Sequence, residues 1–213
     1  MCYEWEKSFE DTFKLKNEDT NELKIIIGQE PYKCELNGIK FKVSSSICPY
    51  NYLGYSVSFL VTDWIKIQDS LEMVFNLLFK NTVNSIKVLS YLRENKDKIT
   101  AEQFANYLYR KYSIVLTNNS IDNDSDNIEN IKKLIERLDK PTYLLIVGNS
   151  ASESFDKMDK SKMNIKGYAK FIHPSGQVLG NPCCRERYFN NWYNLKDSSD
   201  EQQDVINKFI LME

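Results

Sequence analysis

Short apolar runs alternate with amphipathic segments along most of this chain. Runs that are rich in β-branched residues and bounded by turn formers are typical of buried strands, and they lie at residues 23–27, 114–116, 143–147 and 168–172. Apolar positions with helical spacing fall between and after these runs, at residues 70–79, 83–92, 101–111, 128–138 and 201–211. The alternation of strand and helix favours a largely parallel sheet with helices on both faces.

The pattern predicts an α/β fold of three layers, in which a central, mostly parallel four-stranded sheet is flanked by helices. Two capping boxes, Thr100-x-x-Gln103 and Ser198-x-x-Glu201, predict where the third and the last helix begin. The polar stretches at residues 117–127 and 150–162 are expected to be loops. Because the chain has 213 residues and no evident linker, we expect a single domain over residues 1–213.

The composition excludes several classes of protein. A formal net charge of −2, with 42% hydrophobic and 27% charged residues, is typical of a soluble globular protein. The most apolar run, residues 57–67, is interrupted by Asp63 and Lys66, so we expect neither secretion nor membrane insertion. The five cysteines include no C-x-x-C pair, which disfavours zinc or an iron–sulfur cluster. We therefore expect a cytoplasmic, reducing location, no metal and no other cofactor.

Candidate functional residues follow the first and the last predicted strand. The first strand runs into Gly28-Gln29-Glu30-Pro31-Tyr32, which combines a tight turn, an amide and a carboxylate. The last strand runs into His173-Pro174-Ser175, which holds the only histidine of the chain. Parallel sheets bind ligands beyond the carboxyl ends of their strands. We expect both runs to contribute to one site, although each taken alone also fits an ordinary surface turn.

The upstream part of the chain resembles the uracil-DNA glycosylases. Residues 25–32 are similar to the family's strand and water-activating loop, which reads G-Q-D-P-Y-H. Residues 38–43 are similar to G-[LV]-x-F-S-V, the segment with the phenylalanine that stacks on uracil. Residues 70–75 resemble the start of the helix that follows the family's proline-rich loop, but the prolines are missing here.

The downstream part resembles the same family, in the same order. Residues 114–121 are similar to the strand L-L-L-N-[AT]-V, and residues 143–151 to the strand that ends in W-G-x-x-A. Residues 172–175 match the H-P-S opening of the minor-groove loop, and Arg185-x-x-Tyr188-Phe189 is similar to the C-R-H-F stretch after it. A short string such as H-P-S recurs by chance, whereas this ordered combination is strong evidence for a resemblance to the superfamily.

The resemblance implies roles for the residues at the matching positions. Glu30 would orient the attacking water, and His173 would donate a hydrogen bond to the departing uracil anion. Phe41 would stack on the base, and Tyr32 would exclude the methyl group of thymine. Either Asn118 or Asn119 would bind the Watson–Crick edge, because the register of that match is ambiguous by one residue. Gln29 completes the expected substrate-binding set.

The resemblance also implies DNA contacts through small residues and cations. The expected DNA-binding residues are Lys33, Ser70, Gly148, Asn149, Ser150, Ser175, Gln177, Val178, Leu179, Arg185 and Arg187. Gln177 stands where the family inserts a leucine into the base stack, so Val178 or Leu179 is the wedge if the loop is reshaped. For the arginines, a solvated face is the alternative interpretation.

The sequence supports two hypotheses about function. The first is a monomeric repair enzyme that flips uracil out of single- or double-stranded DNA and hydrolyses its N-glycosidic bond, with a proteinaceous glycosylase inhibitor as a further expected partner. The second is a protein with the glycosylase fold that binds DNA, a base or a protein partner with little or no catalysis. The second is favoured by three departures from the family pattern: Glu30 replaces an aspartate, Lys33 replaces a histidine, and the loop after Ser175 is altered.

Overall fold

A parallel sheet lies at the centre of the computed structural model, which describes residues 21–28, 33–36, 39–42, 69–79, 82–99, 101–119, 128–171 and 199–211. Four strands form the sheet in the order β4-β1-β5-β6, and all neighbouring pairs run parallel. Their bounds are β1 Leu23–Gly28, β4 Ile114–Asn118, β5 Thr142–Val147 and β6 Ile165–Phe171. The predicted α/β fold with a central four-stranded sheet is thus confirmed.

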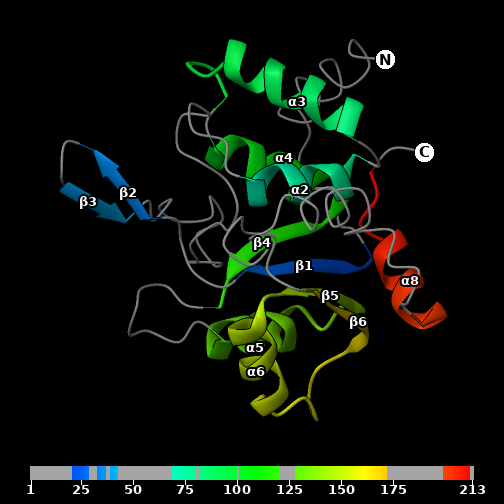
Figure 1. Ribbon diagram of the computed structural model, residues 1–213. Coiled ribbons are helices and arrows are strands. Elements are labelled where there is room, and N and C mark those ends of the chain that lie inside the picture. Colours follow the sequence, from blue (N-terminus) through cyan, green and yellow to red (C-terminus); the bar gives the residue numbers. More distant parts are fainter. Residues whose placement is uncertain are drawn as a thin grey trace.

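Helices cover both faces of this sheet, so that the described part has three layers (Figure 1). One face carries α2 (Asp69–Leu78), α3 (Thr82–Glu94) and α4 (Ala101–Tyr112). The other face carries α5 (Ile128–Leu138) and α6 (Asn149–Lys157). A last helix, α8 (Asp200–Asn207), lies beside β6. No helix in the described ranges is long and apolar enough to cross a membrane.

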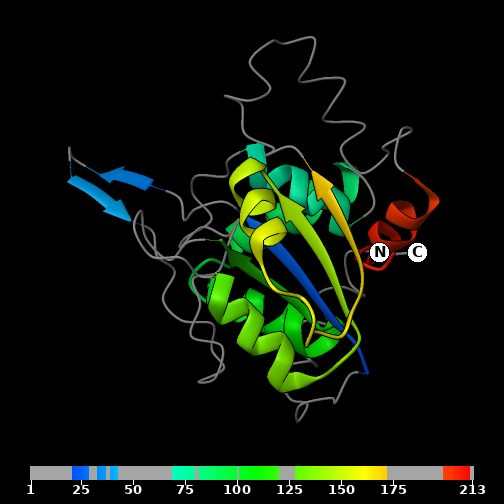
Figure 2. The ribbon, with the colours of Figure 1, turned by 90° about the horizontal axis from the view of Figure 1, so that it is seen from below.

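A second, two-stranded sheet follows β1 in the sequence. It pairs β2 (Lys33–Leu36) with β3 (Ile39–Lys42) in antiparallel register, and Cys34 lies opposite Phe41. In both ribbon views this hairpin stands apart from the four-stranded sheet (Figures 1 and 2). The apolar pattern of these short strands did not predict them, because four residues give too few alternations to be distinguished from a loop.

The central strand β1 is buried on both of its faces. Ile26 packs into the apolar core shared with α2 and α4, whereas Ile25 and Ile27 pack into the core shared with α5 and α6. All three side chains are 0% exposed. Burying an isoleucine side chain stabilises a fold by about 1.5–3 kcal/mol. The continuous Ile25-Ile26-Ile27 run is therefore the signature of a strand that is covered from both sides.

The stretch after β5 forms a helix where we expected a loop. Its sequence, Asn-Ser-Ala-Ser-Glu-Ser-Phe-Asp-Lys, is rich in residues of modest helix propensity. Only Ala151 and Phe155 are apolar in α6. Both are buried against the sheet, on the same face as α5. Because these two residues are four positions apart, a helix brings both to one face. Tertiary packing thus overrides weak local propensity here.

The amino end of α8 differs by one residue from the predicted capping box. The cap is Ser199, whose hydroxyl oxygen accepts a hydrogen bond from the backbone N–H of Gln202 at 3.4 Å. Ser199-x-x-Gln202 has the same S-x-x-Q pattern as a capping box, so two overlapping candidates were present in the sequence. Ser198, like Thr100 of the other predicted box, lies outside the described residues.

Polar contacts join the beginning of β1 to the last helix. The Lys208 ammonium donates to Glu22 at 3.3 Å and lies 4.9 Å from the centre of the Tyr143 ring. The hydrogen bond to Glu22 and the charge of that carboxylate raise the pKa of Lys208. Burial lowers the pKa of Lys24, and the neighbouring Glu22 opposes that shift. Since Lys208 is well exposed, the pair adds little to stability.

The contact between β6 and α8 generates a prediction about stability. A Cβ atom at Gly167 would lie 2.6 Å from the Cγ2 atom of Val205, a buried and β-branched side chain with little rotamer freedom. We expect Gly167→Ala to lower the free energy of unfolding by about 1–2 kcal/mol, because overpacking outweighs the entropic gain of losing a glycine. Urea unfolding measures this change.

The matched control removes the opposing methyl groups. In the double variant Gly167→Ala/Val205→Ala, the loss should be smaller than the sum of the two single losses, because the clash is then absent. Strict additivity of the two changes would contradict the close approach of α8 to β6.

Candidate functional site

The strands β1, β4 and β5 end together at one edge of the sheet. Gly28, the last residue of β1, lies opposite Asn118, the last residue of β4, and Ile27 lies opposite Ile146 of β5. The connection after β1 leads to β4 on one side, whereas the connection after β5 leads to β6 on the other. Such a reversal leaves a crevice beyond the carboxyl ends of the two strands, here β1 and β5.

Two asparagines stand at this edge. Asn118 and Asn119 are 1% and 7% exposed, and the backbone N–H of Asn119 donates to the carbonyl oxygen of Gly28 at 2.7 Å. The Asn119 Nδ2 atom donates to the Ser150 hydroxyl at 3.4 Å. The Asn119 side chain thus extends from the end of β4 to the beginning of α6. The sequence suggested both asparagines as alternatives, and the structure brings Asn119 against another predicted site residue.

The other half of the Asn119 amide is unsatisfied. Its Oδ1 atom is buried and has no hydrogen-bond partner among the described residues. Leaving a buried acceptor unpaired costs about 1–3 kcal/mol, and buried polar groups of this kind call for a specific explanation. An acceptor held ready at the carboxyl edge of a parallel sheet is suited to receive an N–H group from a ligand.

The loop between β5 and α6 supplies donors beside this acceptor. Gly148 has φ 101° and ψ 158°, a conformation accessible to glycine, and its N–H donates to the Phe171 carbonyl at 2.8 Å. Among the described residues no side chain caps α6, and its first intrahelical bond runs from Ser152 N–H to the Gly148 carbonyl at 3.0 Å. The amides of the first helical turn therefore point toward the sheet edge, where the helix dipole favours negative charge.

The remaining predicted residues are placed less fully. Lys33 lies on β2, Phe41 lies on β3 and Ser70 is the second residue of α2, and only the backbone is described at these three positions. The following predicted residues lie outside the described ranges: Gln29, Glu30, Tyr32, His173, Ser175, Gln177, Val178, Leu179, Arg185 and Arg187. Their predicted roles stay predictions.

The described part of this edge holds no metal-binding cluster of side chains. Among the residues described, no group of three or more His, Cys, Asp and Glu side chains could hold a metal ion. The polar groups gathered here are a neutral amide, a hydroxyl and backbone N–H donors, from Asn119, Ser150 and the start of α6. Such a set suits a neutral ligand with a hydrogen-bonding edge, together with a nearby anion.

Sequence reasoning found these residues but not their relation to one another. The match of residues 114–121 marked the asparagines, and the match of residues 143–151 marked Gly148 and Ser150. The pairing of Asn119 with Ser150 depends on α6, which was expected to be a loop. The small residue Ala151 followed four positions later by Phe155 was the one available signal for that helix.

The backbone of Gly148 makes the arrangement testable. A Gly148→Ala substitution forces an L-residue into a sparsely populated conformation, which costs about 1–3 kcal/mol. We expect a corresponding loss in the free energy of unfolding by urea. The control is Asn149→Ala at the next, exposed position, which should change stability by less than about 0.5 kcal/mol. Equal effects of the two substitutions would contradict the special backbone conformation at Gly148.

Comparison with known proteins adds nothing to this geometry. No protein-family model matches the chain, and no curated protein matches it. The chemistry of the site is therefore inferred from its own residues, of which Asn119, Ser150 and Gly148 are the best placed.

Proposed function

We propose that this protein removes uracil from DNA by hydrolysing the N-glycosidic bond of a nucleotide flipped out of the base stack. The observation that carries the proposal is the buried Oδ1 atom of Asn119 at the carboxyl edge of the sheet, which has no hydrogen-bond partner in the described part of the chain. It is supported by the sequence order of the predicted catalytic residues. Glu30 follows the end of β1 by two residues, and His173 follows the end of β6 by two residues.

The Asn119 amide has the polarity that uracil requires. Uracil presents a ring N–H next to a carbonyl, so Oδ1 accepts from the ring and Nδ2 donates to the carbonyl. The bond from Nδ2 to Ser150 is long at 3.4 Å and is therefore easily exchanged for one to a base. Cytosine presents an acceptor and an amino group at the same positions. It would set an acceptor against the Oδ1 acceptor and an amino group against the Nδ2 donor, and sites of this kind discriminate strongly.

Glu30 and His173 would act on opposite sides of the breaking bond. Negative charge develops on the departing uracil, and a donor aimed at its carbonyl oxygen stabilises that charge. We assign this role to His173, as a neutral imidazole. Positive charge develops on the sugar, and a carboxylate both stabilises it and orients the attacking water. We assign this role to Glu30.

The donors at the start of α6 fit a DNA backbone. Helix amino ends bind phosphate groups through free N–H groups and a favourable dipole, and Gly148 and Ser150 are small residues that allow close approach. Phosphate contacts fix the position of a protein on DNA without reading sequence. In our proposal α6 holds the phosphate next to the flipped nucleotide while Asn119 reads the base.

A second candidate function is binding of DNA, a base or a protein partner with little catalysis. Two substitutions favour it: glutamate at position 30, where the glycosylases that the chain resembles have aspartate, and lysine at position 33 in place of histidine. The extra methylene of Glu30 moves the carboxylate by about a bond length, and a misplacement near 1 Å costs on the order of 100-fold in rate.

Uracil excision by the purified full-length protein tests the first candidate. With uracil-containing single-stranded and duplex oligonucleotides, we expect alkali-labile abasic sites to accumulate. The His173→Ala variant should act at least about 100-fold more slowly, because the leaving anion loses its donor. Retained DNA binding without any product from the unaltered protein would favour the second candidate. An unchanged rate in His173→Ala would remove that residue from the reaction.

The two asparagines provide a matched pair of variants. We expect Asn119→Ala to lower uracil excision by on the order of 100-fold or more, because a hydrogen-bonded edge of the base loses its partner. Asn118→Ala should retain activity per folded molecule. Urea unfolding of both variants separates lost activity from lost structure. If Asn118→Ala is inactive while Asn119→Ala is active, the register of the base-binding residue is the opposite of the one proposed.

A further inference from the structure

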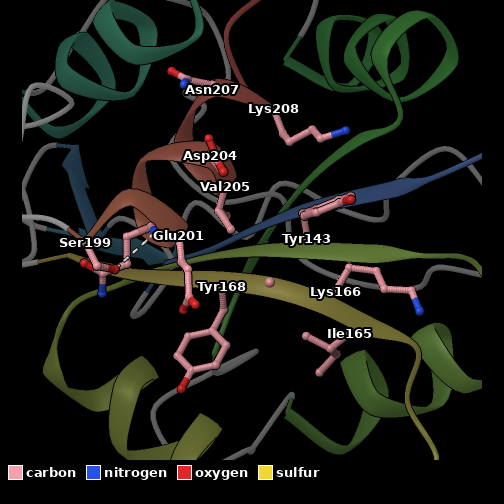
Figure 3. Close-up of a pocket in the computed structure, with 12 residues that line it drawn as sticks. Tyr143, Ile165, Lys166, Tyr168, Ser199, Glu201, Asp204, Val205, Asn207 and Lys208 are labelled. Atoms are coloured by element: carbon pink, nitrogen blue, oxygen red, sulfur yellow. Dashed lines mark hydrogen bonds between the residues drawn. The ribbon is translucent and has the colours of Figure 1, made fainter.

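A groove of about 1020 Å³ lies between the edge strand β6 and the helix α8. Tyr143, Lys166 and Tyr168 line it from the sheet, and Glu201 and Val205 line it from the helix (Figure 3). The sheet residues come from the beginning of β5 and the first half of β6. The groove is therefore separate from the carboxyl edge at which Asn119 lies.

The groove follows the open edge of the sheet. Strand β6 is the last strand in the order β4-β1-β5-β6, and within the described ranges it pairs with β5 alone. The Phe171 carbonyl points toward β5, since it accepts from Gly148. Backbone groups of alternate residues point to opposite edges of a strand, so those of Tyr168 point outward. The groove thus exposes a backbone donor and acceptor that have no partner strand among the described residues.

The two walls of the groove lie on opposite faces of the sheet. The Tyr168 ring packs on the Phe155 ring of α6, with ring centres 4.9 Å apart, and is 46% exposed. Val205 of α8 packs over Gly167 from the other face. An extended chain laid along this edge would place its alternate side chains against Tyr168 and against α8 in turn.

The walls also differ in charge. On α8, Glu201 and Asp204 are exposed, and neither forms an ion pair with any described residue. Lys208 at the end of the same helix is engaged with Glu22 and with the Tyr143 ring. The helical wall therefore presents two carboxylates without an ion-pair partner in the described part of the chain, which are complementary to basic side chains spaced two residues apart on an extended chain.

We propose that this groove docks an extended, basic segment of a partner protein by strand addition to β6. Backbone hydrogen bonds to Tyr168 would supply affinity. Basic side chains facing Glu201 and Asp204, with apolar side chains facing Tyr168, would supply specificity. This role is independent of the proposed reaction at the carboxyl edge.

A second copy of this chain fits the groove less well. Antiparallel pairing of two β6 strands about Tyr168 would bring Lys166 near Lys170 of the other copy. Like charges directly opposite each other across a sheet are destabilising. Lys166 also forms a β-bulge, because Thr142 pairs with Ile165 and the next residue of β5, Tyr143, pairs with Gly167, which leaves Lys166 without a partner in β5. A bulge with a lysine is a common protection of edge strands against pairing with themselves.

Fluorescence anisotropy with short labelled peptides tests the proposal on the full-length protein. The probe alternates lysine with valine, and the matched peptide alternates glutamate with valine. We expect the lysine peptide to bind and the glutamate peptide to bind at least about tenfold more weakly. The double variant Glu201→Gln/Asp204→Asn should bind the lysine peptide about fivefold more weakly, as expected for the loss of two exposed charge pairs. The control Glu129→Gln, on the exposed face of α5, should have no effect.

Backbone methylation separates strand addition from simple charge attraction. In an extended peptide the amides of alternate residues point to opposite edges, so the valine amides and the lysine amides cannot both face β6. Two further peptides therefore carry N-methyl groups either on all valines or on all lysines. Strand addition predicts that one methylated peptide loses binding and the other retains it. Binding that survives both patterns, or is lost in both, overturns the proposal. Failure of the unmethylated lysine peptide to bind, or dimerisation of the protein that excludes it, overturns it as well.

Discussion

The burial of β1 on both faces is the constraint on which the rest of the structure depends. Ile25, Ile26 and Ile27 are withdrawn completely from water, two toward α5 and α6 and one toward α2 and α4. A strand covered in this way must have a neighbour at each edge, because its backbone groups have no access to solvent. The pairing of β1 with β4 at one edge and with β5 at the other meets that requirement.

The candidate site is held in place by the same strand. Gly28 ends β1, and its carbonyl oxygen accepts a hydrogen bond from the backbone N–H of Asn119, so the asparagine is anchored to a strand whose isoleucines are fully buried. A side chain with one unsatisfied atom in such a place is held at a cost in stability. Functional sites commonly retain this kind of unfavourable group, because the ligand supplies the missing partner.

The sequence predicted the elements whose side chains form a long or strongly apolar pattern. The runs that became β1, β4 and β5 were located to within two residues, and α5 was located at its observed bounds, because Ile128, Ile131 and Ile135 mark its buried face. Strand β6 begins three residues before the predicted run, since Lys166 and Gly167 interrupt its apolar pattern. Helix α6 was missed because two buried residues are too few to reveal a period. The contact of Asn119 with Ser150 joins residues 31 apart, which no local pattern encodes.

The strand order also has a consequence for how the chain folds during synthesis. Leu23 of β1 pairs with Thr142 of β5, and Lys24 of β1 pairs with Ile114 of β4. Ribosomes add roughly 5–20 residues per second, so the triple-isoleucine segment emerges several seconds before either neighbour exists. An apolar strand without partners is the kind of segment that aggregates or recruits chaperones. A strand that is buried on both faces in the finished fold is therefore a liability while the chain is still growing.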